Sequence, residues 1–67
     1  MDDICTRVGD TIRKYREKMD ISQERLAELA ELHRTYIGQV ERGEKNLTLR
    51  SLERIAKALK IKARDLL

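Results

Sequence analysis

Proline, phenylalanine and tryptophan are absent from the 67 residues, and cysteine occurs once. A single cysteine excludes an intramolecular disulfide, and no group of Cys and His has the spacing of a zinc site, so we expect neither a metal nor a cofactor. No apolar run approaches the roughly 18–20 residues that cross a bilayer, and the N-terminal MDDICTR lacks the pattern of a secretion signal. These absences predict a cytoplasmic chain that does not contact membranes.

Catalysis is not expected either. An active site needs a nucleophile, a base and stabilising groups that converge in a pocket. The chain offers one histidine and one cysteine, and it has no glycine-rich loop. We therefore expect neither an enzyme nor a protein that binds small molecules.

The residues that are abundant favour helix. Leucine, alanine, glutamate, lysine and arginine are frequent, and only three glycines interrupt them, so the composition predicts an all-α fold. The length fits a single domain, residues 1–67, and the core of so small a domain supplies only about 3–5 kcal/mol of net stability. Without a disulfide or a metal, oligomerisation is the remaining source of stability.

Apolar residues at helical spacing predict five helices. The stripe of the first helix, over about residues 6–19, consists of Val8, Ile12, Tyr15 and Met19. Thr6 is its predicted N-cap, and Asp20 stands where a residue in the left-handed conformation ends many helices. Ser22 is the predicted N-cap of the second helix, whose inward face consists of Leu26, Leu29 and Ala30.

The third predicted helix, about 34–42, turns Ile37 and Val40 inward and ends before Gly43. Asn46 or Thr48 caps a fourth helix, whose buried stripe consists of Leu52, Ile55, Ala56 and Leu59. The terminal RDLL predicts a short fifth helix. Because the last apolar residues need cover, we expect a two-fold interface in the region 55–67 that contains Ile61, Leu66 and Leu67.

Only residues 30–33 separate the second and third predicted helices, which is the layout of a helix-turn-helix. In this motif the second helix lies in the DNA major groove, and the first crosses the phosphate backbone. Charge alone does not indicate this site, because residues 21–45 carry four basic and five acidic side chains. Residues 46–67 carry six basic and two acidic ones, so we expect backbone anchoring largely downstream of Asn46.

Four pieces of the chain occur in the order and spacing of a known family: VGDTIRKYR, ISQERLAELA, LHRTYIGQVERGE and NLTLRSLERIAKAL. Through them the chain resembles the lambda-repressor/Cro type (XRE-like) of helix-turn-helix domain over nearly its whole length. Within that family, LHRTYIGQVERGEKNLTLRSLE is most similar to the small controller proteins of bacterial restriction–modification systems. The resemblance implies a compact five-helix domain and a homodimer. It also implies a partly palindromic operator ahead of the protein's own gene, which is regulated together with the endonuclease gene.

The resemblance also implies which residues touch DNA. The family's groove-facing positions are occupied here by Arg34, Thr35, Tyr36 and Gln39. Arginine suits guanine, glutamine suits adenine, and a threonine methyl suits thymine. Gln23 matches a glutamine that contacts a phosphate at a helix N-terminus, and Arg16 and Glu41 match a pair that is salt-bridged in the family. The full set expected on the DNA backbone is Gln23, His33, Arg42, Lys45, Asn46, Thr48 and Arg50.

Three residues depart from the family pattern. Glu31 and Lys60 stand where glycine is common, and Lys62 stands where a serine or threonine caps the last helix. A side chain in the left-handed conformation costs on the order of 1 kcal/mol, so we expect a slightly altered path in the turn at Glu31.

Two alternatives remain open at the level of sequence. The chain could be an antitoxin whose main partner is a toxin protein, although the five helices leave no separate toxin-binding segment. It could also be one piece of a longer regulator with a ligand-sensing domain, although the start at Met1 argues against a missing N-terminus. RNA polymerase is a further candidate partner of a DNA-bound regulator.

Overall fold

Residues 3–67 are described by a computed structural model, and within this range every regular element is a helix and there is no strand. The elements are α1 (Ile4–Lys18), α2 (Gln23–Ala30), α3 (Arg34–Glu41), α4 (Leu49–Ala58) and the 3-10 helix η1 (Ala63–Leu66). The predicted five-helix, all-α fold is confirmed, and the fifth helix is a single 3-10 turn. Over the same residues, no helix combines the length and apolar character that crossing a membrane requires.

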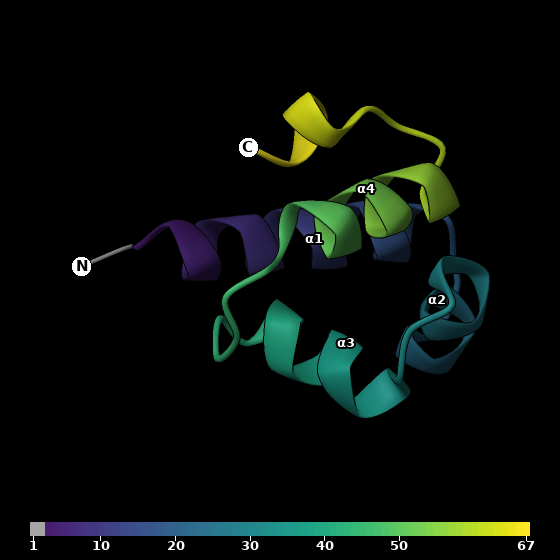
Figure 1. Cartoon of the computed structure of the whole chain (residues 1–67). Coiled ribbons are helices and arrows are strands. Elements are labelled where there is room, and N and C mark those ends of the chain that lie inside the picture. Colours follow the sequence, from purple (N-terminus) through teal and green to yellow (C-terminus); the bar gives the residue numbers. More distant parts are fainter. Residues whose placement is uncertain (1–2) are drawn as a thin grey trace.

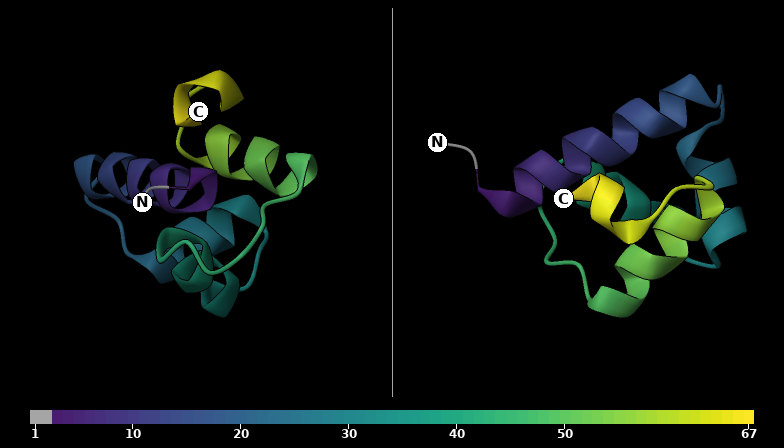
Figure 2. Two further views of the ribbon diagram at one scale, coloured as in Figure 1. Left: turned by 90° about the vertical axis from the view of Figure 1, so that its left-hand side faces the viewer. Right: turned by 90° about the horizontal axis from the view of Figure 1, so that it is seen from above.

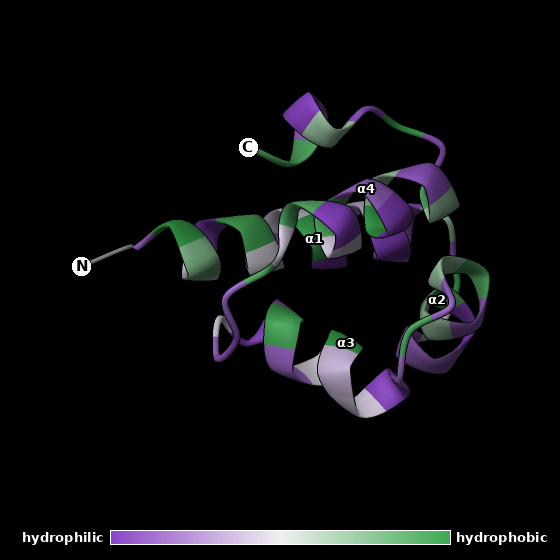
Figure 3. Cartoon of the chain, in the orientation of Figure 1, coloured by the Kyte–Doolittle hydropathy of each residue, from purple (hydrophilic) through white to green (hydrophobic). Residues whose placement is uncertain are grey.

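Helices α1 and α4 form the middle of the molecule, with α3 on one side of them and η1 on the other (Figures 1 and 2). Helix α3 packs on α1 and α2, whereas α4 packs on α2 and η1. The apolar faces of the helices turn toward the centre (Figure 3). The buried core consists of Val8, Ile12, Leu26, Ala27, Ala30, Ile37, Val40, Leu52, Ile55, Ala56, Leu59 and Leu66.

The helix caps follow the sequence at two of three predicted places. Ser22 Oγ accepts from the backbone N–H of Arg25, and Thr48 Oγ1 accepts from that of Ser51, both at 3.0 Å. The prediction that Thr6 caps α1 was wrong, because the helix begins at Ile4. Asp3 is the N-cap, and its carboxylate accepts from the backbone N–H of Thr6 at 2.9 Å.

The turn between α2 and α3 follows the path that a glycine would take. Glu31 lies in the left-handed region with φ of 58°. Two backbone hydrogen bonds close the turn, from Glu31 N to Glu28 O at 3.2 Å and from Leu32 N to Ala27 O at 2.9 Å. These bonds hold the residue in a conformation that costs about 1 kcal/mol, so the expected change of path was wrong. Asp20 and Lys60 are left-handed too.

Two leucines lie elsewhere than the sequence predicts. Leu29 is exposed, because Leu26, Ala27 and Ala30 fill the buried side of α2 and leave Leu29 at its edge. Leu66 is only 1% exposed, because η1 folds back onto α4 and α1 and inserts this side chain into the core. Leu66 therefore cannot supply its side chain to an interface with a second copy, and that part of the prediction was wrong.

Gly9 allows α1 and the end of α3 to touch through their backbones. A Cβ at this position would collide with the carbonyl oxygen of Val40 and lie 2.9 Å from that of Glu41. Backbone atoms cannot move aside as a side-chain tip can. We expect Gly9→Ala to lower the free energy of unfolding by about 1–3 kcal/mol, as overpacking does in other cores, measured by urea denaturation.

Gly38→Ala is the matched control for this prediction. Its added Cβ would meet only side-chain atoms, at 3.3 Å from Arg42 Nη1 and 3.5 Å from Gln23 Oε1. Since alanine is the better helix former, we expect Gly38→Ala to leave stability unchanged or to raise it by up to about 1 kcal/mol. Equal stability of the two variants would show that the backbone contact at Gly9 is not close enough to matter.

Candidate nucleic-acid interface

The N-terminal half of α3 presents polar side chains at the surface. Ile37 and Val40 are fully buried, so the opposite side of the helix faces outward. Arg34 and Thr35 are exposed on this side, as predicted, and Gln39 is half-buried. His33 occupies the N-cap position but makes no side-chain cap hydrogen bond. The exposed polar side chains of α3 therefore lie at its N-terminal end, next to the turn between α2 and α3.

Tyr36 differs from its neighbours because its ring packs against the core. The residue is half-buried and belongs to the apolar shell around the buried cluster. A ring held in this way has a fixed position, and its hydroxyl is the only polar atom that it can offer. This arrangement suits a single hydrogen bond rather than an adaptable contact.

Arg16 and Glu41 form the ion pair that the sequence predicts. Arg16 Nε lies 2.7 Å from Glu41 Oε2 and Nη2 lies 3.1 Å from Oε1, so the contact is bidentate. Their side chains are only 13% and 2% exposed. The third nitrogen, Nη1, donates to the carbonyl of Ile21 at 2.9 Å. The hydrogen bond to Glu41 raises the pKa of the Arg16 guanidinium above its usual value.

Gln23 joins this pair from α2. Its amide Nε2 donates to Glu41 Oε1 at 3.0 Å, so the last residue of α3 is tied to both α1 and α2. The amide carries a second hydrogen, which remains available for the phosphate contact that the sequence predicts. We define Arg16, Gln23 and Glu41, with the Ile21 carbonyl, as the orienting network.

A shallow cleft runs between the start of α2 and the outward face of α3. It is lined by Arg16, Ser22, Gln23, Glu24, Arg34, Thr35, Gly38 and Arg42. The cleft brings together Gln23, Arg34, Thr35 and Arg42 from the predicted set of DNA contacts. Glu24 also lies here, with its Oε2 3.3 Å from Arg34 Nη1, a contact that the sequence analysis missed.

Arg42 is held by a neighbour in the sequence. Its Nε and Nη2 donate to the two carboxylate oxygens of Glu44 at 2.9 and 3.2 Å. This hydrogen bonding holds the pKa of the Glu44 carboxyl below its usual value. A phosphate contact by Arg42 requires this pair to open or the remaining Nη1 to be used.

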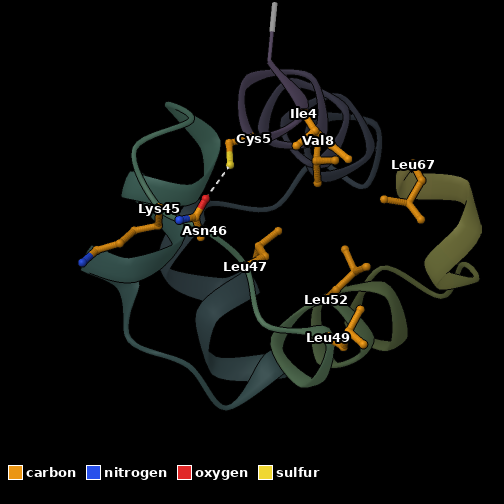
Figure 4. A pocket seen from close by; sticks show the side chains of 9 residues that line it. All are labelled: Ile4, Cys5, Val8, Lys45, Asn46, Leu47, Leu49, Leu52 and Leu67. Atoms are coloured by element: carbon orange, nitrogen blue, oxygen red, sulfur yellow. Dashed lines mark hydrogen bonds between the residues drawn. The ribbon is translucent and has the colours of Figure 1, made fainter.

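The other predicted backbone contacts are spread around the α3–α4 connection. Asn46 Oδ1 accepts from Cys5 Sγ at 3.1 Å, and the Lys45 amine extends away from the apolar side chains nearby (Figure 4). Thr48 uses its hydroxyl oxygen as the α4 cap. Arg50 lines a separate groove between α2 and α4, together with the basic residues Arg25, Arg54, Lys57 and Lys60. These downstream basic residues thus line a different groove from the cleft beside α3.

An apolar groove lies where α1, the α3–α4 connection and the C-terminus meet (Figure 4). Its lining includes Ile4, Leu49 and Leu67, which are all exposed, and Leu49 is 85% exposed. Ile61 is half-buried against the core and does not line it. Leu49 was not predicted as part of an interface, although it stands three residues before the buried Leu52 and thus on a neighbouring part of the same helix face.

Within residues 3–67, no group of three His, Cys, Asp or Glu side chains is arranged to hold a metal ion. The polar groups that do converge are hydrogen-bond donors and arginines beside the N-terminus of α2 and the face of α3. Such groups suit phosphate oxygens and base edges. The site is that of a helix-turn-helix DNA-binding domain.

Comparison with known protein families supports this class. The helix-turn-helix family model matches residues 12–66. The chain belongs to this family, and its relatives indicate the branch within it.

The control protein C.SmaI of Serratia marcescens is 53% identical over 57 residues, which cover 85% of this chain and 68% of the relative. The crystal structure of the restriction-modification controller protein C.AhdI from Aeromonas hydrophila superposes with a TM-score of 0.92 at 40% identity, over 94% of this chain and 96% of that one. The C.Esp1396I tetramer, solved with its natural operator, has a TM-score of 0.86 at 39% identity, over 92% and 82%.

These relatives group the chain with the controller proteins of restriction–modification systems, and it is a transcriptional regulator of that kind. The resemblance predicted from the sequence is confirmed. The antitoxin alternative has no support among them.

Glu41→Ala tests the orienting network. The substitution leaves the largely buried Arg16 charge without its carboxylate, and removing one partner of a buried pair typically costs about 3–5 kcal/mol. We therefore expect the free energy of unfolding to fall by about this amount, measured by urea denaturation and circular dichroism.

Glu44→Ala is the control, because Glu44 also pairs with an arginine but both side chains are more than half exposed. An exposed pair contributes about 0–1 kcal/mol. A loss for Glu41→Ala no larger than that for Glu44→Ala would show that Arg16 is not left as an uncompensated buried charge.

Proposed function

We propose that the protein binds double-stranded operator DNA as a homodimer, with α3 in the major groove. The observation that carries the proposal is the asymmetry of α3. Its C-terminal residue, Glu41, is tied to α1 and α2, while Arg34 and Thr35 at its other end are exposed. A helix anchored in this way presents its N-terminal residues to base edges in a fixed orientation.

Each predicted contact has a chemical role in this proposal. The Arg34 guanidinium pairs with guanine O6 and N7, Gln39 with adenine, and Thr35 with a thymine methyl. Tyr36 offers one hydroxyl contact. Gln23 meets a phosphate with its second amide hydrogen. The same backbone role is proposed for His33, Arg42, Lys45, Asn46, Thr48 and Arg50, whose contacts make binding dependent on salt.

We infer dimerisation from the small number of base pairs that one recognition helix can contact. One recognition helix covers only a few base pairs, so selective binding needs two half-sites about one helical turn, ~34 Å, apart. We propose the apolar groove around Ile4, Leu49 and Leu67 as the two-fold interface. This revises the interface expected from the sequence, since Leu67 is retained and Leu66 belongs to the core.

The regulated genes follow from the relatives. C.SmaI and C.AhdI are named as control proteins, the latter of a restriction–modification system. We propose that this protein binds ahead of its own gene and controls that gene together with a restriction–modification operon. It would act in the cytoplasm, share the promoter with RNA polymerase as a partner, and need neither catalysis nor a small-molecule ligand.

Arg34→Ala tests base recognition. We expect a loss of about 1–3 kcal/mol on the duplex upstream of the coding sequence and loss of discrimination at one base pair. Gel-shift titrations on this duplex and on its single-base variants measure both. Arg13→Ala is the control, since Arg13 lies exposed on α1 and pairs with Asp10. Equal weakening of Arg34→Ala on every sequence would assign Arg34 to the phosphate backbone.

Leu49→Asp tests the interface. Because Leu49 is largely exposed, the fold should persist, while a carboxylate in the groove should oppose its burial against a second copy. We expect the wild type to sediment as a dimer at micromolar concentration and Leu49→Asp as a monomer. Leu29→Asp changes an exposed leucine outside the groove and should remain dimeric. A Leu49→Asp protein that still dimerises would place the interface elsewhere.

A further inference from the structure

Glu24 and Arg34 link the two helices of the DNA-binding motif across ten residues of sequence. Glu24 lies in the first turn of α2, and Arg34 is the first residue of α3. Arg34 Nη1 donates to Glu24 Oε2 at 3.3 Å, and the side chains are 69% and 67% exposed. Within residues 3–67, the other two nitrogens of this guanidinium donate to no protein atom.

The neighbouring pair of Arg42 and Glu44 differs in the atoms that it uses. There Nε and Nη2 both donate to the carboxylate, so one full edge of the guanidinium is occupied. In Arg34 only Nη1 is engaged, and the Nε–Nη2 edge stays free. Two adjacent N–H groups of this kind make the bidentate contact with guanine O6 and N7.

We infer that Glu24 is a positioning residue that determines DNA specificity by holding Arg34 in an orientation suited to a base. This inference rests on the proposed operator binding. On the operator, Arg34 contacts guanine with its free edge while Nη1 remains on Glu24. On other DNA, the negative charge of Glu24 beside Arg34 opposes contact between this guanidinium and a phosphate.

The location of the pair supports this role. Both residues line the cleft between α2 and the outward face of α3, together with Thr35. The orienting network holds the opposite end of α3, so Glu24 acts on a helix that is already fixed. The acidic side chain therefore restrains one side chain, not the backbone of the reading helix.

Glu24→Gln is the test. Affinity is measured for the duplex immediately upstream of the coding sequence and for a scrambled duplex of equal length and composition. We expect Glu24→Gln to tighten binding to the scrambled duplex. The ratio of the affinity for the upstream duplex to that for the scrambled duplex should fall by about two- to fivefold, which is the effect expected of an exposed ion pair. The unfolding midpoint should not change.

Glu28→Gln is the matched control, because it removes the same charge from the same helix. Glu28 makes its ion pair with Arg25 at 2.9 Å and not with Arg34, so its variant should keep the wild-type ratio. In an Arg34→Ala background, Glu24→Gln should no longer change the ratio. This double-mutant cycle of Glu24 and Arg34 separates an effect on the position of Arg34 from a general effect of charge.

Three outcomes would overturn the inference. The first is that Glu24→Gln changes the affinity ratio no more than Glu28→Gln does. The second is that Glu24→Gln raises the ratio, which would mean that Glu24 only competes with DNA for Arg34. The third is that Glu24→Gln changes the ratio equally when Arg34 is replaced by alanine. Failure of the proposed function itself looks different. In that case the wild type and Glu28→Gln would both bind the two duplexes equally.

Discussion

The buried ion pair of Arg16 and Glu41 determines how α3, the proposed recognition helix, lies on the rest of the molecule. Removing two charges from water is costly, and their attraction offsets that cost only when geometry and hydrogen bonding are nearly complete. Both Glu41 oxygens have donors here, and all three Arg16 nitrogens have acceptors. Because any rotation of α3 would break several of these bonds together, the network restricts α3 to one orientation. Its main effect is on geometry rather than on net stability.

Close backbone packing supports the same arrangement. Gly9 lets α1 approach the carbonyls of Val40 and Glu41, so the ion pair and the glycine contact act on the same end of α3. Gly38 leaves space beside Gln23 and Arg42 on the cleft side. The two glycines thus have different roles, since one meets fixed backbone and the other meets movable side chains. Only the first is required by packing.

Local periodicity explains what the sequence could predict. The stripes of α1, α3 and α4, and the caps at Ser22 and Thr48, depend on spacing within a helix and are visible in sequence. The errors concern choices that need the tertiary structure. Asp3 and Thr6 are both good capping residues, and the burial of Leu66 depends on where η1 docks. The ion pair of Arg16 and Glu41 was predicted only through family resemblance, while nothing local indicated that Glu24 reaches Arg34.

The ion pairs account for the acidic residues in the proposed DNA-reading segment, residues 21–45, which carries a slight negative charge. Four of the five glutamates in residues 21–45 are paired with arginines, in the pairs Glu24–Arg34, Glu28–Arg25, Glu41–Arg16 and Glu44–Arg42. Unpaired arginines at these places would attract any phosphate backbone, which strengthens binding without regard to sequence. In the three exposed pairs, the glutamate occupies part of the guanidinium, weakens this general attraction and leaves the remaining donor nitrogens free. The slight negative charge of residues 21–45 is therefore compatible with the proposed sequence-specific binding, which would depend on the positions of individual donor groups.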